Sequence, residues 1–169
     1  MSNLLVNISQ TQAVMLLAQA QASLNLVVQA LQQAITSAQT AGSANVNLST
    51  AALQGLAAQI QLASEAVVQA RVRQMQQIMV RIRTAEENIR VRARQMQIAN
   101  ILAQARVSLS ATLRTVQRLL TAAQTMGGSA SVTVAAAQQI LAEIQAAAMA
   151  VAGALVAQQQ TVMILTGQA

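Results

Sequence analysis

The sequence contains no cysteine, histidine, lysine, aspartate, proline, tryptophan, tyrosine or phenylalanine. Without His, Cys or Asp the chain cannot build an ordinary site for zinc or another transition metal. A serine or threonine nucleophile would lack a histidine or lysine base, and no lysine is present to complete a phosphate-binding P-loop. We therefore expect a protein that is not an enzyme and that holds no metal or cofactor.

Long apolar runs are also missing. The longest strictly apolar run is "AAAMAVAGALVA", residues 146–157, which is shorter than the roughly 20 residues that span a bilayer. The start, "MSNLLVNISQ", has neither the basic region nor the cleavage site of a signal peptide. We expect no signal peptide and no clear transmembrane segment, although the C-terminal helix comes nearest to one.

Alanine, glutamine, valine, leucine, isoleucine, serine, threonine and arginine make up most of the chain. A chain of 169 residues is one domain by length and can bury a core. Many alanines let helices approach closely but leave little apolar area per residue. Such a protein would gain stability by burying further surface against copies of itself.

The chain matches itself when its second half is laid over its first half. The stretch "QTQAVMLLAQAQASLNLVVQALQQAITSAQTA" (10–41) lies over "QMQIANILAQARVSLSATLRTVQRLLTAAQTM" (95–126). "GSANV" (42–46) then lies over "GSASV" (128–132), and residues 56–80 lie over 140–164. This order of shared blocks indicates an internal duplication of the whole chain.

Each copy reads as a helical hairpin. A first arm over about 4–40 and a second over about 49–83 flank "AGSANVNLS", which supplies a glycine stop, a short extended piece and Ser49 or Thr50 as an N-cap. In the second copy "GGSASVT" does the same, with Thr133 as the cap. The sequence therefore predicts one all-α domain of two tandemly duplicated long helical hairpins, 1–84 and 85–169, with four helices in a bundle or extended within an assembly.

The junction of the two copies leaves two topologies open. Thr84-x-x-Glu87 fits a capping box and favours a new helix there. However, no Gly or Pro occurs between Gly55 and Gly127, so residues 49–125 could also form one uninterrupted helix. The duplication favours the break, because it makes residue 84 equivalent to the region around the N-terminus.

The first arm carries more than one apolar face. One packing stripe at helical spacing consists of Leu17, Leu24, Val28, Leu31 and Ile35. Leu4, Ile8, Met15 and Leu26 fall roughly opposite. Two stripes favour packing inside the hairpin and again against neighbouring subunits, so we expect stripes such as Leu17–Ile35 to drive self-assembly. The alternative is a loosely patterned four-helix bundle.

Charge is confined to the middle of the chain. Residues 1–64 have no charged side chain, and all the arginines lie at Arg71, Arg73, Arg81, Arg83, Arg90, Arg92, Arg94, Arg106, Arg114 and Arg118. Three of them replace Gln21, Gln29 and Gln33 of the first copy, so the hairpin does not require them. Arginines two apart project about 200° from each other, which suits a helix end that contacts a polyanion.

Arginine donates bidentate hydrogen bonds to phosphate, and its charge does not titrate away. No aromatic side chain is present to stack on single-stranded bases. We therefore predict that these arginines bind double-stranded DNA without sequence preference. The alternative is a solvated face that serves solubility, although such a face would be spread out and mixed with Glu and Lys.

Two helical hairpins around "GSANV" and "GSASV", with a basic junction at Arg71–Arg94, resemble the capsid and nucleocapsid proteins of filamentous, rod-shaped and spindle-shaped archaeal viruses. The resemblance implies small helical subunits that pack side by side through apolar faces and present basic side chains to enclosed DNA. It implies a virion protein; without it, we expect a cytoplasmic one.

Three other interpretations stay open from the sequence. The chain could be an amphipathic helical coat on a storage granule or lipid surface, a filament without nucleic acid, or an engineered bundle. The uncharged segment 1–64 favours the surface coat, with lipid as the second choice of partner after DNA.

Overall fold

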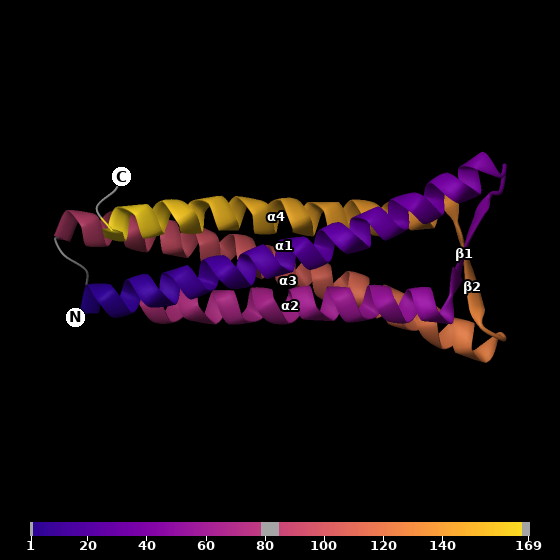
Figure 1. Ribbon diagram of the computed structural model, residues 1–169, viewed down its shortest axis with the longest axis horizontal. Helices are drawn as coiled ribbons and strands as arrows, with labels where there is room; N and C mark the ends of the chain where they lie inside the picture. The colour runs from indigo at the N-terminus through magenta and orange to yellow at the C-terminus, as the bar shows by residue number, and fades with distance from the viewer. Residues whose placement is uncertain (1, 79–84, 167–169) are drawn as a thin grey trace.

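The computed structural model describes the backbone of residues 2–78 and 85–166, and the side chains of residues 10–73 and 89–161. In this part of the chain the elements are α1 (Ser2–Thr40), β1 (Asn45–Ser49), α2 (Thr50–Ile78), α3 (Ala85–Thr125), β2 (Ser129–Thr133) and α4 (Val134–Thr166) (Figure 1). The expected all-α class with four long helices is confirmed. The only addition is the small two-stranded sheet in the described residues.

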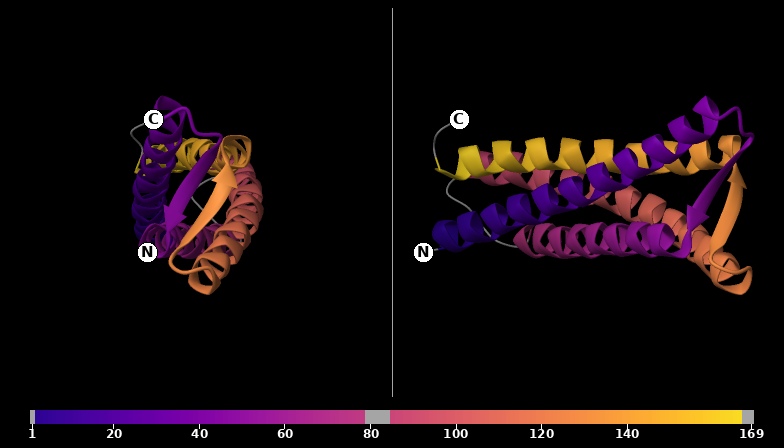
Figure 2. Two further views of the ribbon diagram at one scale, coloured as in Figure 1. Left: turned by 90° about the vertical axis from the view of Figure 1, so that its right-hand side faces the viewer. Right: turned by 45° about the vertical axis from the view of Figure 1, so that its right-hand side comes forward.

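The four helices form an antiparallel ring. α1 packs against α2 and α4, and α3 packs against the same two helices from the other side. Figure 2 shows this ring end-on, with the strand pair across its mouth. Both strands lie at one end of the bundle, whereas the start of α1, the end of α2, the start of α3 and the end of α4 lie at the other (Figure 1).

The core follows a repeat in which buried positions alternate between steps of three and four residues. In α1 six successive buried positions are Ala13, Leu17, Ala20, Leu24, Val27 and Leu31; in α3 six are Ile98, Leu102, Ala105, Leu109, Thr112 and Val116. The two sets correspond one to one, in order, in the alignment that lays Gln10 over Gln95. This spacing keeps one seam of each helix facing its neighbours, as in left-handed coiled coils.

The stripe of α1 that was expected to pack subunits together lies mostly in the core of the single chain. Leu17, Leu24, Leu31 and Ile35 are at most 5% exposed inside the chain's own core, so they are not available to a second subunit in this fold. Val28 is only half-buried, because its neighbour Val27 takes the core position. The opposite stripe is the one that stays open: Met15 is 59% and Leu26 54% exposed.

Glycines end the first helix of each hairpin. Gly42 has φ +70°, and Gly127 and Gly128 have φ +90° and +114°, a left-handed region that favours glycine. Ser43 N–H donates to Ala38 O at 2.9 Å, and Gly128 N–H donates to Ala123 O at 2.8 Å. These are the bonds of a Schellman cap, which satisfies carbonyls left over at a helix end.

The extended pieces expected in the two turns pair with each other. β1 and β2 are antiparallel, with Asn47 opposite Ser131 at their centre. The strands begin at Asn45 and Ser129, so Val46 corresponds to Ala130. The alignment of "GSANV" with "GSASV" is therefore out of register, because the second turn is shorter and the matching letters do not occupy matching positions.

Both predicted N-caps of the second arms are confirmed. The Ser49 hydroxyl accepts the Ala52 N–H at 3.1 Å, and the Thr133 hydroxyl accepts the Ala136 N–H at 3.1 Å. A single helix over 49–125 is ruled out, since α2 and α3 run antiparallel; residues 79–84 between them lie outside the described residues. Two helices that pack side by side replace the single long helix. The capping box at Thr84 lies outside the described residues.

Two leucines of α1 test the assignment of core and surface. Leu24 is fully buried and Leu26 is half exposed. Leu24→Ala should lower the free energy of unfolding by about 2–5 kcal/mol, whereas Leu26→Ala should change it by less than about 0.5 kcal/mol in the monomer. Urea titration followed by circular dichroism at 222 nm measures both. Equal effects would contradict the orientation of α1.

Candidate functional site

Two shallow hollows lie at matching places on the two hairpins and differ in charge. The hollow on α3, about 640 Å³, is lined by Arg114, Gln117, Arg118 and Thr121. The hollow on α1, about 750 Å³, is lined by Gln29, Gln32, Gln33, Thr36 and Ser37. The first four of these α1 residues align, in order, with the four α3 residues. The fold thus forms the same hollow twice, once with glutamine and once with arginine.

The arginines of this hollow continue along α3. Arg106, Arg114 and Arg118 are exposed and lie within about 120° of one another around the helix; we call them the arginine face. Arg114 Nε donates to Ser110 O at 3.4 Å, which leaves its terminal nitrogens unused within the chain. Among the described side chains no ion pair joins an arginine to a carboxylate. The arginine face therefore carries uncompensated positive charge.

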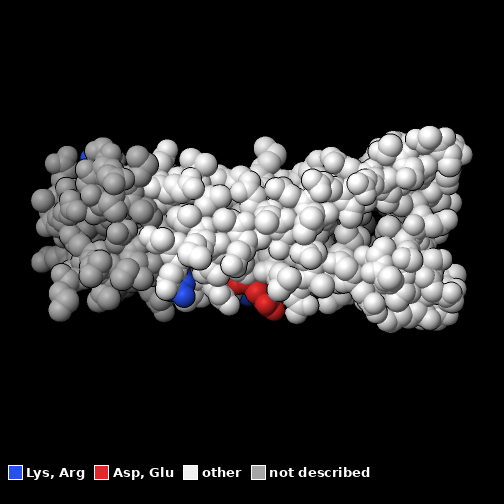
Figure 3. Space-filling view, in the orientation of Figure 1, with Lys and Arg blue, Asp and Glu red and all other residues white. Residues whose placement is uncertain are grey.

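The opposite side of the bundle is uncharged. α1 lies diagonally across from α3, since each packs mainly on α2 and α4, and α1 has no charged residue. In Figure 3 the described surface over α1 and α4 is almost entirely uncharged, and the few charged atoms in view lie mainly along the lower edge, where α2 runs. The molecule is thus basic along one side and neutral along the other.

Glutamines replace aliphatic residues in the core toward the end of the bundle that holds the N-terminus. Gln10, Gln95 and Gln158, from α1, α3 and α4, are at most 1% exposed; we call them the glutamine layer. Gln158 Nε2 donates to the backbone oxygen of Gln10 at 3.2 Å and also to its side-chain oxygen. Gln10 and Gln95 align with each other in the two copies and occupy equivalent core positions.

Four half-buried arginines surround this layer: Arg71 and Arg73 on α2, and Arg92 and Arg94 on α3. We call them the arginine collar. Arg73 Nη1 donates to Gln12 Oε1 on α1 at 2.6 Å, and Arg94 Nη1 donates to Gln160 Oε1 on α4 at 2.6 Å. Each bond joins the two helices of one hairpin. Arg73 and Arg94 therefore lie between the two helices of a hairpin. Arg71 and Arg92, two residues earlier, lie about 200° away around their helices.

Several buried polar atoms near the collar have no hydrogen-bond partner among the described residues. Gln95 uses neither its amide nitrogen nor its amide oxygen, and the Nε atoms of Arg71 and Arg92 are also buried without a hydrogen bond. Arg71 lies seven residues before the end of α2 and Arg92 seven residues after the start of α3. Because the two helices pack antiparallel, these arginines lie at about the same level of the bundle.

The structure thus separates the predicted arginines into groups. The collar and the arginine face are distinct, Arg90 is exposed near the start of α3, and Arg81 and Arg83 lie outside the described residues. The glutamine layer was not predicted. Its signal was present in the sequence, because Gln10 and Gln95 sit three residues before the core positions Ala13 and Ile98.

Two of the helices are long and apolar enough to cross a membrane by length and composition alone. They cover Gln10–Thr40 in α1 and Val134–Thr161 in α4. The expectation of no clear transmembrane segment stays a prediction, because a helix in the core of a bundle meets the same two criteria. In this fold the two helices pack against each other as members of the bundle.

Comparison of this chain with protein-family models, with curated proteins and with solved structures finds no match.

The two kinds of buried glutamine predict opposite effects of the same substitution. Gln95→Met should raise the free energy of unfolding by about 1–2 kcal/mol, because it removes a buried amide that has no partner. Gln158→Met should lower it by about 1–3 kcal/mol, because it leaves the Gln10 oxygens without their donor. Urea titrations of both variants against the parent protein measure this. Two shifts of the same sign would contradict the hydrogen bonding of the glutamine layer.

Proposed function

We propose that this protein is a self-assembling structural protein that coats or packages double-stranded DNA. The observation that carries the proposal is the pair of matching hollows. The hollow on α1 is lined by Gln29 and Gln33, and the matching hollow on α3 has Arg114 and Arg118 at the same two positions. The arginines are not needed for folding, and no carboxylate compensates them among the described side chains, so their role is to meet an external anion.

The chemistry of the arginine face favours phosphate. A guanidinium group can donate two parallel hydrogen bonds to phosphate oxygens. The arginine face runs along a straight helix, so its members contact a row of backbone phosphates and carry no base-reading residue at its centre. Binding of this kind gives affinity by release of counterions, without sequence preference. The lack of aromatic side chains favours the duplex over single strands, which bind largely by base stacking.

The second half of the function is assembly. The neutral side of the bundle carries exposed apolar residues such as Met15 and Leu26, which is where copies can pack without bringing their arginines together. A coat of this kind places neutral sides between subunits and basic sides on the DNA. This arrangement supports a capsid or nucleocapsid role of the kind that the sequence resembles, with the virion as its location.

A second candidate function is a coat on a lipid or granule surface. It is favoured by the lack of charge on α1 and by the two helices that are long and apolar enough to enter a membrane. In this case the neutral side would face the apolar surface, and the arginines would lie in solvent. Binding to the surface would then survive the removal of the arginines.

An exchange of residues between the two hollows tests DNA binding. Arg114→Gln with Arg118→Gln makes the α3 hollow match the α1 hollow. The slope of log affinity against log salt for duplex DNA should fall in magnitude by about 2, because two phosphate contacts are lost. Titration of a labelled random-sequence duplex at several salt concentrations, followed by fluorescence anisotropy, measures the slope.

The matched control moves the charge instead of removing it. Adding Gln29→Arg and Gln33→Arg to the double variant restores the net charge of +6 but places the arginines diagonally across the bundle. Binding should stay as weak as in the double variant, because the moved arginines cannot reach the phosphates held by Arg106. Recovery of the parent slope would show that net charge alone binds DNA, and unchanged binding in the double variant would refute the proposal.

The missing aromatic residues give a direct observation of what the protein carries. Without Trp, Tyr or Phe the chain absorbs almost nothing at 260–280 nm. A gently purified sample should therefore show a strong 260 nm band that nuclease destroys and that raised salt releases from the protein. An assembled sample with no such band would favour the surface coat.

A further inference from the structure

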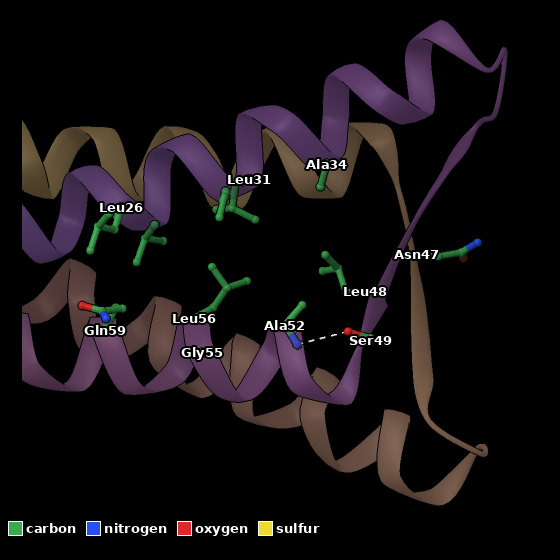
Figure 4. A pocket seen from close by; sticks show the side chains of 12 residues that line it. Leu26, Leu31, Ala34, Asn47, Leu48, Ser49, Ala52, Gly55, Leu56 and Gln59 are labelled. Carbon is green, nitrogen blue, oxygen red and sulfur yellow. Dashed lines mark hydrogen bonds between the residues drawn. The ribbon is translucent and has the colours of Figure 1, made fainter.

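A deeper apolar hollow lies in the first hairpin, between α1 and α2. It measures about 480 Å³ and is lined mainly by aliphatic side chains, among them Leu26, Leu31, Leu48 and Leu56. Figure 4 shows Leu31 and Ala34 reaching down from α1, Leu56 and Ala52 reaching up from α2, and Leu48 of β1 closing the end near the strands. Asn47 points away from it. No charged residue lines this groove.

Small residues line the groove, and two of them differ in size from their counterparts in the second hairpin. Ala34 on α1 and Gly55 on α2 are replaced by Leu119 and Gln139 at the matching positions of the second hairpin. At the same level of the second hairpin a hydrogen bond joins α3 to α4: the Thr112 hydroxyl donates to Glu143 Oε2 at 3.1 Å. The fold can therefore accept larger side chains where the first hairpin leaves space.

Gly55 needs an explanation that the single chain does not provide. It lies inside α2, where glycine weakens a helix. Its φ is not in the left-handed region, and a Cβ built on it would meet no atom within 4 Å. Neither backbone strain nor crowding within the chain thus requires glycine. Gly55 thus leaves the backbone of α2 bare beside the groove, where another helix can approach closely.

The surroundings of the groove indicate what approaches. Leu26 on α1 lines it and is 54% exposed, and Leu62, farther along α2, is 55% exposed. On α1 the exposed face around Leu26 is uncharged and holds Met15, Ala18, Ala22 and Ala30 together with Gln19, Gln29 and Gln33. An uncharged apolar helix fits into a groove of this kind, and α1 itself is such a helix.

The charge distribution selects a second copy of the chain. Two copies with a net charge of +6 each repel each other unless they dock through a side without arginines. α1 is that side, since it lies diagonally across from α3. Docking through α1 leaves both arginine faces on the outside, and a symmetric pair that uses the same patch twice is the commonest form of soluble oligomer.

We propose that two copies of this chain form a symmetric dimer in which α1 of each copy lies along the α1–α2 groove of the other and buries Leu26. This dimer is one form of the self-association that the proposed function requires, and in that sense it rests on the proposed function. It does not depend on DNA, because no arginine takes part. The dimer is the unit that presents two arginine faces in opposite directions.

Sedimentation equilibrium of the full chain without DNA, from 1 to about 200 µM, tests the dimer. The parent protein should show twice the monomer mass of 17.6 kDa at the upper concentrations. Leu26→Gln should raise the dimer dissociation constant at least tenfold, because it places a polar amide in an apolar contact. Val107→Gln is the matched control: Val107 is 69% exposed on α3, and its change should leave the constant within about twofold.

Gly55→Gln separates docking from folding. It introduces the residue that the second hairpin carries at Gln139, so it should raise the midpoint of thermal unfolding and yet weaken the dimer at least tenfold. A parent chain that stays monomeric at 200 µM would overturn the proposal. A rise in the dimer dissociation constant with Met149→Gln on α4, and not with Leu26→Gln, would also overturn it, since α4 would then be the occupant. A monomer that floats with neutral phosphatidylcholine vesicles would overturn it as well, since the occupant would then be lipid.

Loss of dimerisation with DNA binding intact would overturn only this inference. Loss of DNA binding in the arginine exchange with the dimer intact would concern only the proposed function. The variant used for this comparison is Arg114→Gln with Arg118→Gln, which changes only α3. Gln29→Arg and Gln33→Arg are left out of it, because both lie on the exposed face of α1 that docks in the dimer.

Discussion

The whole structure depends on a core of small aliphatic side chains at positions that alternate by three and four residues. Because no aromatic residue is available, no single large side chain anchors the bundle. The apolar area must be collected from many alanines, valines and leucines along helices of 29–41 residues. Helix length and close approach replace side-chain size, and this leaves outward faces free of packing constraints. Those faces are where the two hairpins differ.

The two hairpins have the same arrangement of helices and strands and differ in the side chains on their surfaces. Core residues of the first arms correspond pairwise, as Leu17 and Leu102 do, and the second arms start at the equivalent residues Thr50 and Val134. On the surface the same positions hold glutamine in one hairpin and arginine in the other, or glycine in one and glutamine in the other. Each hairpin is therefore a control for the other, and a substitution copied from the matching position is one that this fold already accommodates.

The sequence was sufficient for the features that local chemistry decides. The helices, the glycine stops at Gly42 and Gly127, the caps Ser49 and Thr133 and the break before Ala85 all depend on residues close together in the chain. The pairing of β1 with β2 could not be predicted, because it requires the two turns to meet at one end of the bundle. The use of Leu17 and Leu24 within one chain, instead of between subunits, depends on how many helices surround α1. The groove beside Gly55 appears only when α1 and α2 are placed together.

The one-sided charge also affects how a molecule moves before it touches anything. Arginines concentrated on α3, with none on α1, give the bundle an electric dipole across its width. In the field of a polyanion such a body experiences a torque as well as an attraction, so it rotates toward a preferred orientation during its approach. A single copy would therefore turn its arginine face toward a polyanion before the two make contact.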